Sequence, residues 1–242
     1  MNFHYPERSW LFAGTLLAMV CAAPHGASAQ VSMSATGSYS QNFDTPTLAN
    51  SGTTNAWTDN STIANWYWQQ TNVSTVYQAG TGSGTGGARY SFGLAAASDR
   101  AMGTLASGTA TALAEGLLLQ NTSGQAITDI KVTYTGEQYR DGGNASLATQ
   151  PLSFYYQISG APITNLSAGS NGAWTSVAAL NFISPIHNAA AATLDGNQAA
   201  NRTVFTNVSI PSLTVPNGSY IMLKWDDVND AGNDHALAID DV

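Results

Sequence analysis

The sequence predicts an all-β protein, built as an antiparallel β-sandwich or barrel. Short runs that alternate apolar and polar residues follow one another along the chain, and turns rich in Gly, Pro, Asn and Asp separate them. The clearest run is 127–140, in which Ile130, Val132 and Tyr134 share one face and polar residues take the other. Amphipathic helical periodicity does not occur between the runs, which argues against an alternation of strands and helices.

Residues 1–29 have the pattern of a secretory signal peptide. Arg8 supplies a positive start, residues 11–23 form an apolar stretch too short to span a bilayer comfortably, and residues 27–29 (Ala-Ser-Ala) form a small-residue cleavage site. We therefore expect a mature chain of residues 30–242 that is secreted or held at the cell surface. The only cysteine, Cys21, lies in the signal peptide, which excludes disulfides, thiolate metal sites and cysteine nucleophiles from the mature chain.

The mature chain of about 210 residues is expected to form a single β-sandwich domain, since it can bury a core without disulfides. Strands are predicted at residues 31–39, 66–70, 89–93, 99–108, 114–121, 127–140, 152–159, 174–177, 180–182, 202–210 and 219–225. Residues 79–87 are dominated by Gly, Ser and Thr and predict a loop. Residues 184–200 are the least strand-like, and their alanines are compatible with a short helix that a turn at 194–197 would end.

The charge balance argues against nucleic-acid binding. The whole chain has a formal net charge of −8, and removal of Glu7 and Arg8 with the signal peptide leaves this value unchanged. A nucleic-acid groove needs clustered Lys and Arg to neutralise phosphates. Here the basic residues of the mature chain are scattered singly: Arg89, Arg100, Lys131, Arg140, Arg202 and Lys224. No apolar run of the mature chain approaches the length of a membrane span, so we expect no membrane-spanning segment there.

Residues 224–242 carry an unusual density of acids between two apolar runs. Six aspartates fall within sixteen residues: Asp226, Asp227, Asp230, Asp234, Asp240 and Asp241. So many like charges repel one another unless solvent, hydrogen bonds or a cation offset the repulsion, and oxygen ligands at irregular spacing suit Ca²⁺. A solvated acidic turn is the alternative, because Asp, Asn and Gly are also common turn residues.

Aromatic and charged residues offer two further candidate binding features. Trp57, Trp66 and Trp68 predict either a plug in the sandwich core or a platform on which sugar rings stack. Glu137 and Arg140, three residues apart beside Tyr139, predict either an ion pair that braces a loop or a pair that grips a ligand.

Catalytic patterns are weak. His187 and His235 are the only histidines of the mature chain, and neither a Gly-x-Ser-x-Gly elbow nor a His-Glu-x-x-His motif accompanies them. Glu115 and Glu137 fall on different predicted strands, so the sequence does not place two carboxylates across one cleft, as glycoside hydrolysis requires. The balance favours a protein that is not an enzyme.

Several segments together resemble a module of secreted bacterial proteins. The resemblance rests on residues 42–44 (Asn-Phe-Asp), 90–93 (Tyr-Ser-Phe-Gly), 99–101 (Asp-Arg-Ala), 134–140, 194–197, 201–202 and 225–241. In that family the module precedes a sorting tail of the Pro-Glu-Pro (PEP-CTERM) kind or stands ahead of extracellular hydrolase domains. The resemblance therefore implies further domains in a longer protein.

The ending at residues 238–242 (Ala-Ile-Asp-Asp-Val) is also similar to the close of MAM domains and of carbohydrate-binding modules, which are concanavalin-like jelly rolls. In those domains, acids near the first and last strands hold a structural calcium ion. The resemblance implies such a site at Asp44 with Asp240 or Asp241, joined by Asp226, Asp227 or Asp234. Those domains normally continue through a final strand, so either the last strand is short or the chain lacks its last strand or a C-terminal tail.

Together, these observations predict a secreted, non-catalytic module. We expect it to bind a glycan or another surface polymer, or to serve as a cell-surface spacer, with Ca²⁺ as a structural ion. The alternative is a hydrolase, either a glycosidase or the accessory module of an extracellular nuclease or phosphoesterase.

Overall fold

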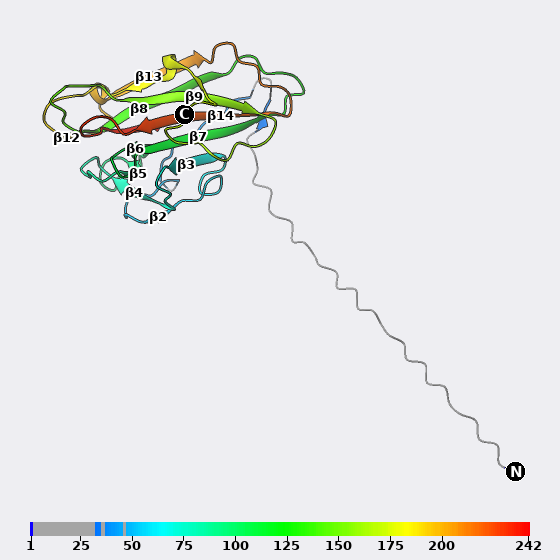
Figure 1. Ribbon diagram of the computed structural model, residues 1–242, viewed down its shortest axis with the longest axis horizontal. Helices are drawn as coiled ribbons and strands as arrows, with labels where there is room; N and C mark the ends of the chain where they lie inside the picture. The colour runs from blue at the N-terminus through cyan, green and yellow to red at the C-terminus, as the bar shows by residue number, and fades with distance from the viewer. Residues whose placement is uncertain (2–31, 35–36, 46) are drawn as a thin grey trace.

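Strand-forming segments of this chain assemble into two curled sheets that pack face to face (Figure 1). The computed structural model describes residues 1, 32–34, 37–45 and 47–242. The predicted signal peptide lies outside the described residues, Met1 apart. Within the described part of the chain the predicted all-β sandwich is confirmed, and helical structure is limited to the short 3₁₀ turns η1 (Ala178–Leu180) and η2 (Ala199–Asn201).

The first sheet runs in the order β1-β7-β14-β9-β10, with β3 beside β7 and β11 beside β9. Its strands are β1 (Ser32–Met33), β3 (Trp66–Gln70), β7 (Ala112–Asn121), β9 (Pro151–Ser159), β10 (Thr175–Ser176), β11 (Phe182–Ile183) and β14 (Tyr220–Val228).

The second sheet runs in the order β12-β8-β15-β6-β5-β4-β2, with β13 also beside β8. Its strands are β2 (Asn55–Ala56), β4 (Val76–Gly80), β5 (Ala88–Phe92), β6 (Ala101–Leu105), β8 (Lys131–Asp141), β12 (Ala192–Thr193), β13 (Arg202–Ser209) and β15 (Ala236–Asp240). The pairings are antiparallel except for β1 with β7 and β4 with β5, which are parallel. The acid-rich segment crosses between the layers, because β14 belongs to the first sheet and β15 to the second.

Alternate residues of both sheets fill the core. Leu117, Leu223 and Trp225 face it from the first sheet, and Tyr134 and Ile239 face it from the second. The alternation predicted for residues 130–135 is present in β8, where apolar side chains are buried between exposed polar ones. Each sheet packs apolar side chains on its outer face too, under covering loops. Strands such as β6 and β7 are therefore buried on both faces, which conceals their period of two.

Two segments differ from the expectation. The alanines of residues 189–192 do not form a helix, and a turn at 196–197 leads instead into η2. The predicted glycine-rich loop is shorter than expected at its start, because Ala79 and Gly80 belong to β4. Gly82 follows with φ +83°, and a Cβ there would lie 1.8 Å from the backbone oxygen of Tyr139. Only glycine allows this backbone approach.

Candidate functional site

Neighbouring acids on β14 point to opposite faces of their sheet. Asp226 points outward, where its carboxylate accepts hydrogen bonds from the Gly169 backbone N–H at 3.0 Å and the Asn171 amide at 2.9 Å. It also lies 3.8 Å from Lys224 Nζ. Asp227 shares the inner face with Trp225 and is buried. Strand alternation therefore separates two of the predicted calcium ligands.

Asp234 closes the loop between β14 and β15. Its Oδ1 accepts a hydrogen bond from the backbone N–H of Asp230 at 2.7 Å. Burial raises the pKa of Asp234, and the backbone hydrogen bond partly offsets that rise. This hydrogen bond stabilises the turn between the two strands. An acidic turn was the alternative to a calcium site that the sequence left open for these aspartates.

Five carboxylates gather where the start of the domain meets its last strand. We call them the edge carboxylate cluster: Asp44, Asp99, Glu137, Asp240 and Asp241. Asp99 interacts electrostatically with both Asp44 and Asp241, and Asp240 interacts with Glu137, Asp241 and Asp99. Asp44 and the two final aspartates thus share a common neighbour, Asp99, which the sequence did not single out as a ligand.

Backbone and side-chain contacts fix the cluster in place. Asp44 accepts hydrogen bonds from the Arg100 backbone N–H at 3.1 Å and from the Asn42 amide at 2.9 Å. Nearby, Gln41 and Val242 exchange two backbone hydrogen bonds of 2.8 and 2.9 Å. The N-terminal segment and the end of β15 are therefore held side by side.

The buried members of this cluster disfavour full ionisation. Burial, assisted by like charges, raises the pKa of Glu137 to about 7 and that of Asp240 to about 9. The Tyr139 hydroxyl donates to Glu137 Oε2 at 2.8 Å, which partly offsets the effect on Glu137. Protons or a bound cation would relieve the remaining repulsion.

Across residues 32–34, 37–45 and 47–242, no three Asp, Glu, His or Cys side chains already converge in a way that would hold a metal ion. An ion at the edge carboxylate cluster would therefore take some ligands from amides, backbone carbonyls or water, all of which Ca²⁺ accepts. Asn42 and Asn197 are amides beside the cluster, bonded to Asp44 and Asp99 respectively.

The three candidate tryptophans do not form a sugar platform, because packing buries all of them. Trp57 and Trp68 contact each other edge to face at 5.3 Å, and Trp57 Nε1 donates to Asp59 at 2.6 Å. Trp66 Nε1 donates to the Tyr39 hydroxyl at 2.7 Å. Their indole faces are covered by other core side chains, so the core alternative holds.

Glu137 and Arg140 do not pair with each other in the part of the chain that the structure describes. Glu137 is buried with Tyr139, whereas Arg140 is half-buried and donates to the backbone oxygen of Gly82 at 3.4 Å. Both interpretations of the sequence, an ion pair that stabilises a loop and a pair that binds a ligand, required the two side chains to act together. Because Glu137 and Arg140 have different partners, neither interpretation holds.

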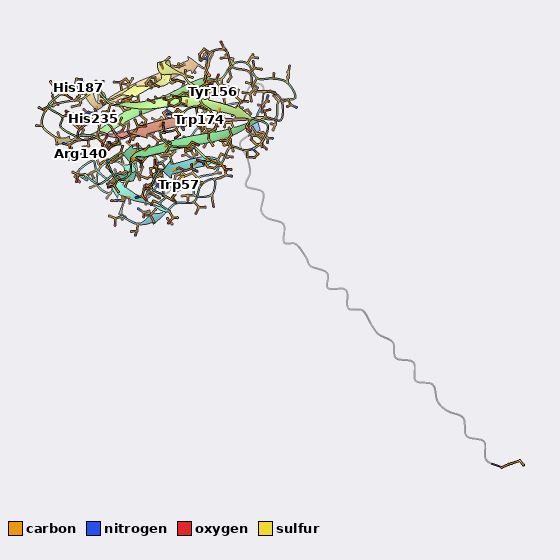
Figure 2. All side chains as sticks on the ribbon, in the orientation of Figure 1. Trp57, Arg140, Tyr156, Trp174, His187 and His235 are labelled. Atoms are coloured by element: carbon orange, nitrogen blue, oxygen red, sulfur yellow. The ribbon has the colours of Figure 1, made fainter. Side chains whose placement is uncertain are left out.

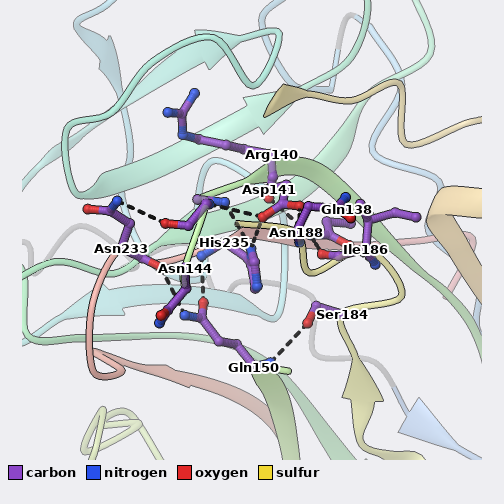
Figure 3. Close-up of polar contacts among 12 residues, drawn as sticks. Gln138, Arg140, Asp141, Asn144, Gln150, Ser184, Ile186, Asn188, Asn233 and His235 are labelled. Carbon is purple, nitrogen blue, oxygen red and sulfur yellow. Dashed lines mark hydrogen bonds and ion pairs between the residues drawn. The ribbon is translucent and has the colours of Figure 1, made fainter. Parts of the chain in front are cut away.

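A polar network ties β8, β9 and β15 together at the end of the sandwich where Arg140, His187 and His235 lie (Figures 2 and 3). Nδ1 of His235 accepts from the Gly142 backbone N–H at 2.9 Å, and the His235 backbone N–H donates to Gln150 Oε1 at 2.5 Å. Asp141 accepts from the Asn188 backbone N–H at 2.6 Å. Because backbone groups occupy these side chains, the network serves to join strands and loops.

Two surface pockets lie beside the first described segment of the domain and Val242. The larger, of about 460 Å³, opens between the N-terminal segment and inner-face residues that include Leu117 and Leu223. The smaller, of about 410 Å³, is lined by residues that include Gln41 and Asp241. Each has a single acidic side chain in its lining, Asp129 in the first and Asp241 in the second, so neither presents the facing pair of side-chain carboxylates that glycoside hydrolysis needs.

In the described residues, no helix is both long and apolar enough to cross a membrane. The chain matches no protein-family model, no curated protein and no solved structure.

Proposed function

We propose that this chain is a secreted, non-catalytic β-sandwich module that binds a glycan or another surface polymer, or spaces a partner domain, and that a structural calcium ion stabilises it. The observation that carries the proposal is the edge carboxylate cluster. It draws Asp44, Asp99, Glu137 and the Asp240–Asp241 pair from separate parts of the sequence to one place.

A calcium ion suits this cluster for electrostatic reasons. Like charges brought together by folding destabilise the folded state, and a cation that binds only that state offsets the repulsion. Calcium accepts carboxylate, amide and water oxygens in flexible geometry. In that role Asp44 and Asp241 would be ligands, and Asp99 would join them.

Exposed polar side chains support the polymer-binding part of the proposal. Strand β13 lies at an edge of the second sheet and is largely exposed, with hydroxyl and amide groups at Thr203, Thr206, Asn207 and Ser209. Such groups suit hydrogen bonds to a neutral polysaccharide. We therefore propose the exposed face of β13, and not the buried tryptophans, as the polymer-binding surface.

Thermal melts of the purified chain in excess calcium and in EDTA test the proposal. We expect a higher melting temperature in calcium, worth about 2.7 kcal/mol when calcium is at a hundred times its Kd. Asp241→Asn should lose most of this gain. Asp129→Asn, which alters an exposed acid outside the cluster, should keep it. Identical wild-type melts in calcium and EDTA would contradict the calcium proposal, and a glycan array without binding would contradict the polymer proposal.

A further inference from the structure

Two carboxyl groups face the space between the sheets. Glu115 on β7 pairs directly with Trp225 on β14, and Asp227 lies two residues further along the same face of β14. The two acids are thus diagonal neighbours on one face, about 7–8 Å apart at the backbone. Both side chains are buried. Asp227 is the charged neighbour with the strongest electrostatic effect on Glu115.

Neither carboxyl has the partners that a buried acid requires. Both oxygens of Glu115 and Oδ2 of Asp227 make no hydrogen bond within the described part of the protein. Thr104, on β6 of the opposite sheet, interacts with Asp227, yet its buried hydroxyl also lacks hydrogen-bond geometry to any described group. A buried polar group left without a partner destabilises the folded state, and more so when it is charged.

The basic residues near the interior direct their hydrogen bonds elsewhere. Arg89, which pairs with Thr104 across β5 and β6, donates through its two terminal nitrogens to the backbone oxygens of Trp68, Ser74 and Val76, while its buried Nε makes no hydrogen bond with the described groups. Lys224 lies on the outer face of β14 with Asp226. The other charged groups that act on Asp227 are the acids Asp226, Asp230 and Asp234, which add to the negative potential.

We propose that Glu115, Asp227 and Thr104 form an interior cation site that takes a hard divalent ion of the calcium class. Two carboxylates match the charge of a divalent cation, and the hydroxyl reaches the same region from the facing sheet. Carboxylates and hydroxyls supply oxygen ligands of the kind that such ions accept, with water or backbone oxygens completing the shell. A proton alone would neutralise a carboxyl but leave its remaining oxygens without donors.

The indole groups beside Glu115 fit this site. Glu115 stands between Trp68 on β3 and Trp225 on β14 as their direct cross-strand neighbour. Nε1 of Trp68 is buried and makes no hydrogen bond with the described protein groups, whereas Nε1 of Trp225 interacts with the Tyr134 hydroxyl without full hydrogen-bond geometry. N–H donors cannot bind a cation, but they can donate to ligand oxygens or to waters around it, as outer partners of metal ligands do.

Calcium content of the full chain, refolded from denaturant in calcium and then freed of excess ion, tests the site. Because the interior site is independent of the edge carboxylate cluster, we expect about two ions per chain if both are present. Asp241→Asn should retain about one ion and Glu115→Gln about one. Terbium in place of calcium should show luminescence sensitised by tryptophan, and Glu115→Gln should abolish most of this signal.

The outcomes separate the two sites. Loss of all bound calcium in Asp241→Asn, or the same non-zero calcium content in wild type and Glu115→Gln, would overturn the interior site and leave the edge site standing. A wild type without bound calcium would overturn both sites. Calcium retained in Asp241→Asn at the wild-type level and lost in Glu115→Gln would support the interior site and remove the edge site. If Glu115→Gln fails to fold, the content of Asp241→Asn decides, since the interior site requires an ion to remain in it.

Discussion

Nδ1 of His235 lies 3.5 Å from Asp141 Oδ1, yet it accepts its hydrogen bond from the Gly142 backbone N–H at 2.9 Å. This arrangement requires a neutral imidazole with its proton on Nε2. A protonated Nδ1 could not accept from Gly142 and would have to turn toward Asp141. The geometry therefore favours the neutral form of a buried histidine at the junction of β8 and β15.

The His235 arrangement predicts acid sensitivity. Burial lowers the pKa of His235 below its ordinary value of 6.5, against the opposing effect of Asp141. The unfolded chain then takes up a proton before the folded protein does, so the contribution of His235 to stability is complete above about pH 6.5 and falls as pH drops toward the lower folded pKa. The edge carboxylate cluster imposes the opposite slope on the whole protein, so the His235 contribution is measured against His235→Asn, whose amide oxygen can still accept from Gly142. Denaturant unfolding between about pH 7.5 and 5 should show the wild type losing stability relative to this variant as the pH falls, and a constant difference between the two would contradict the prediction.

The edge carboxylate cluster predicts the opposite slope in calcium-free protein. The pKa of Glu137 is raised to about 7 and that of Asp240 to about 9, chiefly by burial. Their contribution to stability is complete below the unfolded values near 4 and is lost as pH rises through the folded pKa values. We expect the melting temperature in EDTA to fall between pH 5 and 9, and Asp240→Asn to flatten the curve. Calcium should raise stability most at high pH, where it no longer competes with protons.

Replacement of the buried Lys224 should greatly reduce the free energy of unfolding. Its buried ammonium donates to Leu166 O at 3.0 Å and Asn171 Oδ1 at 2.6 Å, and it lies 4.2 Å from the Trp174 ring centroid. Lys224→Met would leave Asp226 buried without a cation, which costs about 3–5 kcal/mol. Urea unfolding measures the loss. Lys131→Met, which removes an exposed lysine, is the control and should cost less than about 1 kcal/mol.

The burial of the tryptophans predicts that a soluble quencher will reduce their native fluorescence only weakly. The five within the described residues are each at most 9% exposed. Acrylamide should quench the native fluorescence much less than that of the denatured chain, and an added polysaccharide should leave the emission unchanged. Strong native quenching that a polysaccharide relieves would restore the stacking interpretation.

Two glycines with the same φ allow the cost of a left-handed backbone to be measured separately from the cost of a steric clash. Gly82 and Gly124 both have φ +83°, but a Cβ on Gly124 meets open space, whereas one on Gly82 meets the Tyr139 carbonyl. Gly124→Ala should cost about 1–2 kcal/mol for the left-handed backbone alone. Gly82→Ala should cost clearly more, because backbone atoms must move. Equal unfolding free energies for the two variants would contradict this prediction, because they would show that the loop at Gly82 shifts without a loss of stability.

The sequence alone determined the class of fold, because residues such as Val132 and Tyr134 alternate with exposed polar neighbours and turn residues separate the runs. It also placed Asp44 with the final aspartates, through a resemblance, and the structure gives them Asp99 as a shared neighbour. Asp99 contributed to the resemblance to secreted bacterial modules but was not singled out as a ligand, since only the pairing of β6 with β15 brings it there.

Tertiary packing decided the rest. A tryptophan ring suits a core as well as a sugar platform, so composition could not choose between them, and only the facing sheet shows which is covered. Asp226 and Asp227 are adjacent in sequence, but both faces of β14 are buried, so no exposed–buried pattern revealed that one meets Lys224 and the other enters the interior. Which acids share an environment depends on strand pairing across the two sheets, and that pairing joins residues too far apart in the chain for local pattern to record.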